Sequence, residues 1–510
     1  MHRAHLALLA FASASLAACS SSSGGGTVSA DDGGADTASE TSPDTTPAWK
    51  GPDVEVACAD TLAAIDQAPT TLPATKGAIL KCAHDADLSA ATMTAHLASY
   101  GYVGKALTSG AHVYRVQYRT ERGDPAHSAG FSSAILFLPD TPRAAKLPVI
   151  VASHGSRGQA AACGIYRRPA DQDTVYSDFE RQALPLVGSG YAVLAPDLAG
   201  YAGYGATGNP VSGYAASDDV GRSTLDGARA LKLLAPSLVS DKVVITGHSQ
   251  GGHTALSALA MAETYAAELN IVAVATFSPL WIPQRSWGTI LIAPGLYPLS
   301  GDTLTPNAVS VWYHYTHSEL LDGPGHGGDV FAPGKRAAIK AWVDSQCWAG
   351  SGWTELAKLG SNAGDLFDPA FIAAIADKAS GNGDCPTTDP GKTLCNTWMT
   401  RYLSDRPHLT GKAKTVPIRV FYGALDTTIP PDRVTCALDR LKSDGANYKV
   451  CVDGTTNHST VVSVKASFAA DWIASLTLGE PDPGSCGKDE TAIVDSLGNL
   501  AVCNTLPPND

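Results

Sequence analysis

The chain has 510 residues, of which 44% are hydrophobic, so it exceeds one minimal domain and can bury a sizeable core. Its formal net charge of −13 and its lack of a basic run argue against nucleic-acid binding.

Residues 1–18 have the features of a signal peptide, with a short basic start and an apolar segment too short to span a bilayer. They end in Leu-Ala-Ala before Cys19, which resembles a bacterial lipobox. That resemblance implies cleavage before Cys19 and lipidation of its thiol and amine. The alternative is an ordinary signal peptide cut near Ala18, which would give a secreted protein. Residues 19–50 are rich in Ser, Gly, Thr, Asp and Pro and predict a disordered tether, so any membrane contact is expected only through the lipid.

Cysteine usage agrees with export. Removing Cys19 from the eleven cysteines leaves an even number, which fits an oxidising compartment. Many connectivities are possible. Close spacing favours four pairs and leaves a fifth: Cys58–Cys82, Cys385–Cys395, Cys436–Cys451, Cys486–Cys503 and Cys163–Cys347. No Cys or His cluster has the spacing of zinc ligands, so the sequence predicts no metal site and no cofactor.

The first part of the globular region predicts helices and then strands. Residues 51–110 are expected to form a small helical region closed by its own disulfide. The alternating segments 113–120 and 131–138 predict two antiparallel edge strands. A buried strand over 148–153 follows.

The buried strand runs directly into His154-Gly155-Ser156. A His-Gly loop after this strand is the usual place for the second donor of an oxyanion hole. We therefore assign that role to the backbone N–H of Ser156, with a plain strand-ending turn as the alternative.

A helix over 178–187 leads to a strand over 191–195 and then to Asp197. Asp197 precedes the predicted nucleophile in the chain, which is the wrong order for a catalytic acid here, so we interpret it as a loop-capping residue. An amphipathic helix over 217–235 continues an alternation of strands and helices that predicts parallel pairing. Three tyrosines among glycines could line a substrate entrance or simply pack a long loop: Tyr201, Tyr204 and Tyr214.

The most informative stretch follows that helix. Residues 243–245 form a short β-branched run, and Gly247-His-Ser249-Gln-Gly251 then matches the G-x-S-x-G nucleophile elbow before an Ala- and Leu-rich helix. The sharp turn needs small neighbours on both sides of the serine, which the glycines supply. Ser249 is thus predicted as the nucleophile, and the backbone N–H of Gln250 points to where an oxyanion would form.

After a strand over 271–277 the alternation stops, and residues 280–412 predict an inserted cap with many tryptophans. The sheet resumes over 416–422, and Asp426 lies on the loop that follows. An Asp at this place can accept a hydrogen bond from a catalytic histidine and fix its tautomer. Asp432 is the alternative, although its place after two prolines suits a helix start better.

His458 lies between the last predicted strand, 448–452, and the last helix, 461–476. A base on this loop could reach Ser249 and Asp426 together, and the chain order Ser, Asp, His is the one expected. Other histidines are poorer candidates because they lie on the elbow or in the cap: His248, His253, His314, His317 and His326.

Over roughly residues 110–478 this constellation resembles the α/β-hydrolase superfamily, and more narrowly the secretory lipases and esterases. The resemblance implies core segments over 111–279 and 413–478, a lid within 280–412, and ester or lipid substrates. A disulfide-closed tail over 479–510 is expected to follow. Some members of that lipase group place a side-chain oxyanion donor after the third strand, whereas this chain has His-Gly-Ser156.

The sequence favours a serine hydrolase that cleaves carboxylic esters through an acyl-enzyme. Two other functions stay open. A peptidase of the same fold would need an acidic pair in the cap to bind a free α-amine, and Glu319 or Asp322 could serve. An inactive surface-binding protein is the other, although all three triad positions and the elbow glycines are present. Acyl chain length, the alcohol and the oligomeric state do not follow from the sequence.

Overall fold

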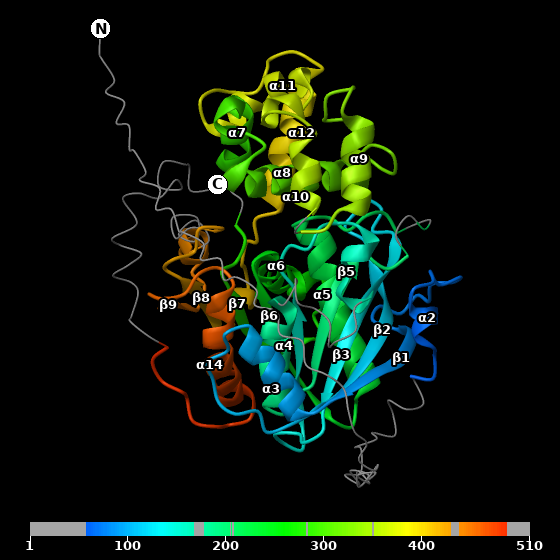
Figure 1. Cartoon of the computed structure of the whole chain (residues 1–510), viewed down its shortest axis with the longest axis vertical. Helices are drawn as coiled ribbons and strands as arrows, with labels where there is room; N and C mark the ends of the chain where they lie inside the picture. Colours follow the sequence, from blue (N-terminus) through cyan, green and yellow to red (C-terminus); the bar gives the residue numbers. More distant parts are fainter. Residues whose placement is uncertain are drawn as a thin grey trace, which may run out of the picture. The chain divides into compact units, whose positions relative to one another are not determined.

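A computed structural model describes residues 58–167, 178–203, 206, 209–281, 284–348, 351–429 and 438–486 (Figure 1). The predicted signal peptide, Cys19, the tether, Tyr204, Asp432, Cys436 and Cys503 lie outside these residues. Within them, no helix combines the length and hydrophobicity that a membrane span requires.

The fold is built on a nine-stranded sheet with the strand order β1-β2-β3-β5-β4-β6-β7-β8-β9. The pairs from β1 to β5 along this order are antiparallel, and all later pairs are parallel, so the sheet is mostly parallel as predicted. The strands are β1 (Ile79–Leu88), β2 (Ala111–Glu121), β3 (Ala129–Pro139), β4 (Leu147–Ser153), β5 (Val193–Ala199), β6 (Val239–His248), β7 (Asn270–Phe277), β8 (Ile418–Gly423) and β9 (Tyr448–Asp453).

Helices cover both faces of the sheet because successive side chains of each buried strand point to opposite faces. In β6, Val243 and Ile245 pack with α5 and α6, whereas Val244 packs with α4 and α14. The helices of this core are α2 (Leu62–Ile65), α3 (Ala90–Ser99), α4 (Asp178–Gly188), α5 (Ser217–Leu234), α6 (Gln250–Tyr265) and α14 (Thr460–Thr477).

The N-terminal region differs from its prediction. It contains the helices α2 and α3 and the predicted Cys58–Cys82 disulfide, but it also contributes β1, which pairs antiparallel with β2 at the edge of the main sheet. Two bulges interrupt this pairing, between Ile79 and Lys81 and between His84 and Ala86. The bulges break the regular alternation that would have marked the strand in the sequence.

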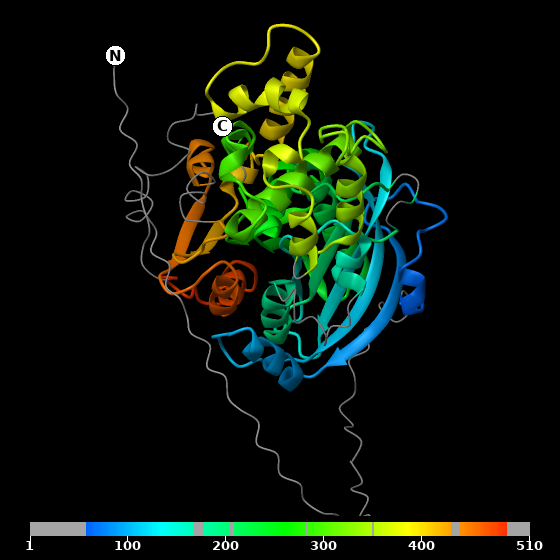
Figure 2. The ribbon, with the colours of Figure 1, turned by 45° about the horizontal axis from the view of Figure 1, so that its top comes forward.

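In the sequence the cap is inserted between β7 and β8, and it is helical (Figures 1 and 2). Its interior is aromatic: Trp312 stacks on Trp342 with ring centroids 5.1 Å apart, and Trp287 lies 4.6 Å from the ring of Tyr313. The cap helices are α7 (Gln284–Ile292), α8 (Leu304–Leu321), α9 (Arg336–Ser345), α10 (Ser351–Ala357), α11 (Pro369–Ser380) and α12 (Gly391–Ser404).

Four disulfides join described residues, and three of them are as predicted: Cys58–Cys82, Cys163–Cys347 and Cys385–Cys395. The predicted pairs Cys436–Cys451 and Cys486–Cys503 are wrong, because Cys451 pairs with Cys486. The chain returns after α14 alongside β9, which brings Cys486 to a cysteine that is distant in sequence. Spacing alone cannot show such a return.

Candidate active site

Ser249 occupies a sharp turn between the end of β6 and the start of α6. Its backbone has φ 55° and ψ −118°, a conformation that an L-residue rarely adopts. A Cβ on Gly247 would lie 2.0 Å from the carbonyl oxygen of Gly251, and one on Gly251 would lie 2.0 Å from that of Ser153. Both glycines are therefore required by close backbone approaches. The turn has the geometry predicted for a nucleophile elbow.

Asp426 and His458 meet at the ends of neighbouring strands, after β8 and β9. The His458 Nδ1–H donates to Asp426 Oδ2 at 2.8 Å, and the backbone N–H groups of Thr428 and Ile429 donate to the other carboxylate oxygen at 2.9 and 2.8 Å. Burial alone would raise the pKa of Asp426. The hydrogen bond and charge of His458, together with the Ile429 N–H, hold that pKa below its ordinary value, so the carboxylate is ionised near neutral pH.

The two predicted partners are thus together, and Asp426 fixes the proton of His458 on Nδ1, which leaves Nε2 as the basic nitrogen. The ring of His248, which the sequence placed on the elbow, lies 4.6 Å from the ring of His458 and donates from Nε2 to the His458 carbonyl at 2.9 Å. The Ser249 hydroxyl makes no hydrogen bond to any described residue, so its contact with His458 stays a prediction. Such contacts often tighten only when substrate binds.

Ser249 lies in the wall of a cavity of about 550 Å³, within the size range of small-molecule sites. The loop after Asp426 also lines it, through Thr427, Thr428 and Ile429. The cap contributes a mainly apolar wall: Trp281, Trp287, Ile290, Tyr297, Pro306, Val309 and Trp348. Its polar members are Ser286, Asp302 and Thr305. The pocket therefore combines the predicted nucleophile and acid loop with an apolar surface.

Ser156 lines the same cavity, on the loop after β4. Its hydroxyl lies 2.6 Å from the hydroxyl of Tyr214, which also lines the cavity. Gln250 is the first residue of α6, where N–H groups have no acceptor within the helix. Of the other tyrosines that the sequence singled out, Tyr201 is buried and donates to the Gly158 carbonyl at 2.7 Å, so it packs the loop.

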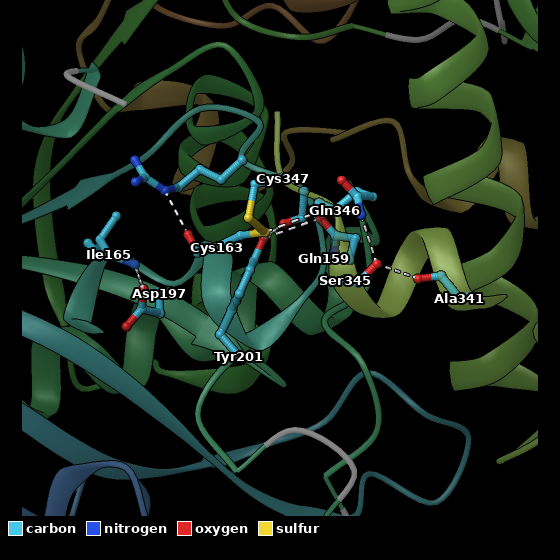
Figure 3. The surroundings of a disulfide bond; sticks show 11 residues. Gln159, Cys163, Ile165, Asp197, Tyr201, Ala341, Ser345, Gln346 and Cys347 are labelled. Atoms are coloured by element: carbon cyan, nitrogen blue, oxygen red, sulfur yellow. Dashed lines mark hydrogen bonds between the residues drawn. A yellow bond between two sulfur atoms is a disulfide. The ribbon is translucent and has the colours of Figure 1, made fainter. Parts of the chain in front are cut away.

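The disulfide Cys163–Cys347 joins the segment after β4, which carries Ser156, to the cap (Figure 3). Cys163 follows the loop that carries Ser156, and Cys347 follows α9. Beside the disulfide, the Trp348 N–H donates to the Arg157 carbonyl at 2.8 Å. Trp348 lines the cavity and directly follows Cys347. The Cys163–Cys347 disulfide therefore holds this part of the cap against the loop that carries Ser156.

Asp197 has the capping role predicted for it. Its buried carboxylate accepts a hydrogen bond from the Ile165 N–H (Figure 3). It also accepts from the Ser133 hydroxyl at 2.6 Å and from the Tyr166 N–H. Burial raises the pKa of Asp197 above its ordinary value, although the hydrogen bonds from Ser133 and Tyr166 act in the opposite direction.

The competing histidines are engaged in the cap interior or at its border. The His317 Nε2 lies 2.6 Å from Asp405, the His253 Nε2 donates to the Asp405 carbonyl at 2.6 Å, and the His314 Nε2 accepts from the Tyr402 hydroxyl at 2.8 Å. None of the three lines the cavity described above.

One residue that supports Asp426 could not be identified from the sequence. Ser278, directly after β7, has φ 40°, its N–H donates to the Phe421 carbonyl at 2.7 Å, and its side chain also lowers the pKa of Asp426. The available signal in the sequence was weak: Ser278 is a small polar residue at the end of β7, and β7 pairs with β8, the strand that precedes Asp426.

Comparison with known proteins gives a fold and a family match for part of the chain. Residues 166–280 match the family model of secretory lipases. The rice cell wall degrading esterase LipA from Xanthomonas oryzae, in a ligand-bound form, is 18% identical over 79% of this chain and 99% of its own, with a TM-score of 0.56. Lipase A of Candida antarctica in its closed state is 17% identical over 85% of this chain and 94% of its own, with a TM-score of 0.55. No curated protein matches the sequence.

At these identities the solved structures establish the fold, and the family match adds support for an ester hydrolase. The matched segment runs from residue 166, ahead of α4, through the elbow serine to residue 280, shortly after β7. The chain thus has the α/β-hydrolase fold of lipases and esterases, and its residues 166–280 match the secretory lipase family.

Proposed function

We propose that the protein is an exported serine hydrolase that cleaves carboxylic esters through Ser249, His458 and Asp426. The observation that carries the proposal is the strained Ser249, which opens into the same cavity as the loop that follows Asp426. Because Asp426 fixes the Nδ1 proton of His458, the Nε2 is the basic nitrogen that would take the proton of the serine hydroxyl.

In the first step, Ser249 attacks the ester carbonyl while His458 takes the hydroxyl proton. The negative charge of the tetrahedral intermediate rests on the backbone N–H groups of Gln250 and Ser156, and one such donor contributes about 3–4 kcal/mol in a well-studied case. His458 then protonates the leaving alcohol. Water, activated by the same histidine, releases the acid from the acyl-enzyme.

The cap wall supports an ester with an apolar acyl group, because its tryptophans offer a surface for hydrocarbon, and Asp302 is the one acidic residue among the described residues that line the cavity. A peptidase is less well supported. Glu319 accepts hydrogen bonds from the N–H groups of Gly325 and Gly327, and Asp322 pairs with Arg401, so the acidic pair considered from the sequence is engaged away from the cavity.

Export also belongs to the proposal. The four disulfides between described residues fit an oxidising compartment, and the family match is to secretory lipases. We propose in addition that the mature protein is anchored through a lipidated Cys19. The mass of the N-terminal peptide from the mature protein tests this, and an unmodified N-terminus would contradict it.

The decisive experiment measures hydrolysis of p-nitrophenyl esters from acetate to palmitate. Ser249→Ala should lower kcat by at least about 10⁴-fold with the fold intact, because the nucleophile is removed. Ser257→Ala is the matched control: it lies on the same helix, its hydroxyl donates to the His253 carbonyl, and its activity should stay within a few-fold of wild type. A fully active Ser249→Ala would overturn the assignment.

The ester series also separates the alternatives. A maximum at short chains would indicate a carboxylesterase with a restrictive cap, and a rise toward palmitate would indicate a lipase. No hydrolysis at any length, together with labelling of Ser249 by a fluorophosphonate, would indicate another acyl substrate, such as a peptide. No labelling at all would favour the surface-binding protein.

A further inference from the structure

A cluster of two histidines and an aspartate lies on the edge strands, at the opposite end of the strand order from β8 and β9 (Figure 1). His84 and Asp87 belong to β1, and His112 belongs to β2. One ligand atom from each of these three residues lies within 4.8 Å of the other two. The reaction proposed above uses none of these residues.

A β-bulge creates the cluster. In the β1–β2 register His84 lies opposite Tyr114 and Asp87 lies opposite His112. Tyr114 and His112 are two residues apart and share one face of the sheet. His84 and Asp87 are three residues apart and would lie on opposite faces of a regular strand. The bulge between His84 and Ala86 returns them to the same face.

We propose that this cluster binds a divalent transition metal, of which Zn²⁺ is the best fit. The ligand atoms would be His84 Nε2, His112 Nδ1 and a carboxylate oxygen of Asp87. Two imidazoles and one carboxylate form an established zinc ligand set that leaves a fourth position for water. Calcium, which takes six to eight oxygen ligands, does not fit two imidazole nitrogens.

The distances suit this assignment. Asp87 Oδ1 lies 3.0 Å from His84 Nε2 and 2.7 Å from His112 Nδ1. Ligand atoms on a tetrahedral zinc with bonds of about 2.0–2.1 Å lie about 3.3 Å apart. Asp87 Oδ1 would therefore move away from the two nitrogens by about 0.3 and 0.6 Å, and the two imidazoles, whose ligand atoms lie within 4.8 Å of each other, would turn toward a common centre. His84 and Asp87 are about half exposed, with 48% and 60% of their side-chain surface accessible, so an ion can enter from solvent.

Asp140, directly after β3, provides the second observation. Its Oδ1 lies 3.1 Å from His112 Nε2, the nitrogen that faces away from the other ligands. Metal-bound histidines usually donate their second N–H to a carboxylate, which orients the ring. His112 Nε2 is buried and forms no hydrogen bond with a described residue, and a metal on Nδ1 would leave its proton on Nε2, on the side of Asp140.

The site would connect three neighbouring strands: β1 and β2 through the ligands, and the end of β3 through Asp140. β1 is an edge strand with two bulges, and Cys82 in it already forms a disulfide with Cys58. A metal would add a second cross-link to a weakly paired edge. We therefore expect it to stabilise the N-terminal edge and to leave ester hydrolysis unchanged.

The test uses the full-length protein without a histidine tag, stripped with a chelator and titrated with Zn²⁺ against a chromophoric chelator. We expect one Zn²⁺ per chain and a rise in Tm on Zn²⁺ addition, with no response to Ca²⁺. His84→Gln and Asp87→Asn should each weaken binding by at least about 10-fold and abolish the Tm shift, and Asp140→Asn should weaken binding by about 10–100-fold. His84 and Asp87 are exposed, so these variants should fold.

His326→Gln is the matched control. His326 and Asp329 form a comparable exposed pair three residues apart in the cap, with His326 Nδ1 2.8 Å from Asp329 Oδ2, but this pair is not part of a three-ligand cluster among the described residues. This variant should bind Zn²⁺ as wild type does. Equal Zn²⁺ binding by wild type and His84→Gln, or none at tens of micromolar Zn²⁺, would overturn the proposal and leave a hydrogen-bonded cluster only.

Discussion

The sheet and the cap contribute to the cavity around Ser249 in different ways. In the sheet, the residues that we assign to catalysis follow three strand ends, with Ser249 after β6, Asp426 after β8 and His458 after β9. The turns after these strands hold the three side chains in position. A shift of one residue in the pairing of β6, β7, β8 and β9 would move them out of position. In the cap, the wall comes from helices and loops, and it is mostly aromatic. From this difference we propose that the sheet determines the reaction and the cap determines which esters enter.

The strongest test of this division acts on the sheet. Asp426→Asn should lower kcat by about 10⁴-fold while KM changes little, because an amide no longer favours the His458 tautomer that activates the serine. The measurement is steady-state hydrolysis of the best p-nitrophenyl ester.

A second His–Asp pair supplies the control for Asp426→Asn. The carboxylate of Asp444 is buried and accepts from His408 Nδ1 at 2.6 Å and from the Leu409 N–H at 2.7 Å. The chemistry is the same, but neither residue lines the cavity of Ser249. Asp444→Asn should therefore reduce stability and keep kcat within a few-fold of wild type. An equal loss of kcat in Asp426→Asn and Asp444→Asn would show that the Asp426–His458 pair contributes to folding and not to catalysis.

The sequence predicted the sheet better than the cap, for a physical reason. β-branched runs and glycine-flanked turns are local signals, so Ser249, Asp426 and the strands that carry them could be located from adjacent residues. The edge strand β1 was missed because its bulges break the alternation, and the Cys451–Cys486 pair was missed because it depends on the path of the tail. Which tryptophans line the cavity depends on helix packing, to which spacing along the chain gives no guide.

The second test removes the disulfide between the cap and the core. Cys163→Ser/Cys347→Ser should destabilise the protein by about 2–5 kcal/mol, since it opens a cross-link between residues that are 184 positions apart. The control is Cys385→Ser/Cys395→Ser, which opens a cross-link over 10 positions inside the cap. In the chain-entropy account the first pair should cost about 2–3 kcal/mol more than the second, as measured by urea unfolding. A larger loss from the pair within the cap would contradict the view that Cys163–Cys347 is the main tie between cap and core.

The last test acts on the cap interior. His314 is fully buried, and its pKa is lowered to about 3 chiefly by burial, with smaller contributions from His317 and Arg401. As the pH falls from about 6.5 toward 3, the unfolded chain takes up a proton at this position and the folded chain does not. Stability should therefore fall with pH, by up to about 1.4 kcal/mol per pH unit from this residue.

In His314→Gln the amide can still form hydrogen bonds but cannot titrate, so the urea midpoint should depend less on pH between 6.5 and 4 than in wild type. Part of the dependence should persist, because burial also lowers the pKa of His253. The exposed His326 should act with the opposite sign, since Asp329 raises its pKa. His326→Gln should consequently leave the acid-induced loss intact or increase it. An unchanged pH dependence in His314→Gln would mean that the cap interior opens to water well before the sheet unfolds, and that the cap is the less stable of the two regions.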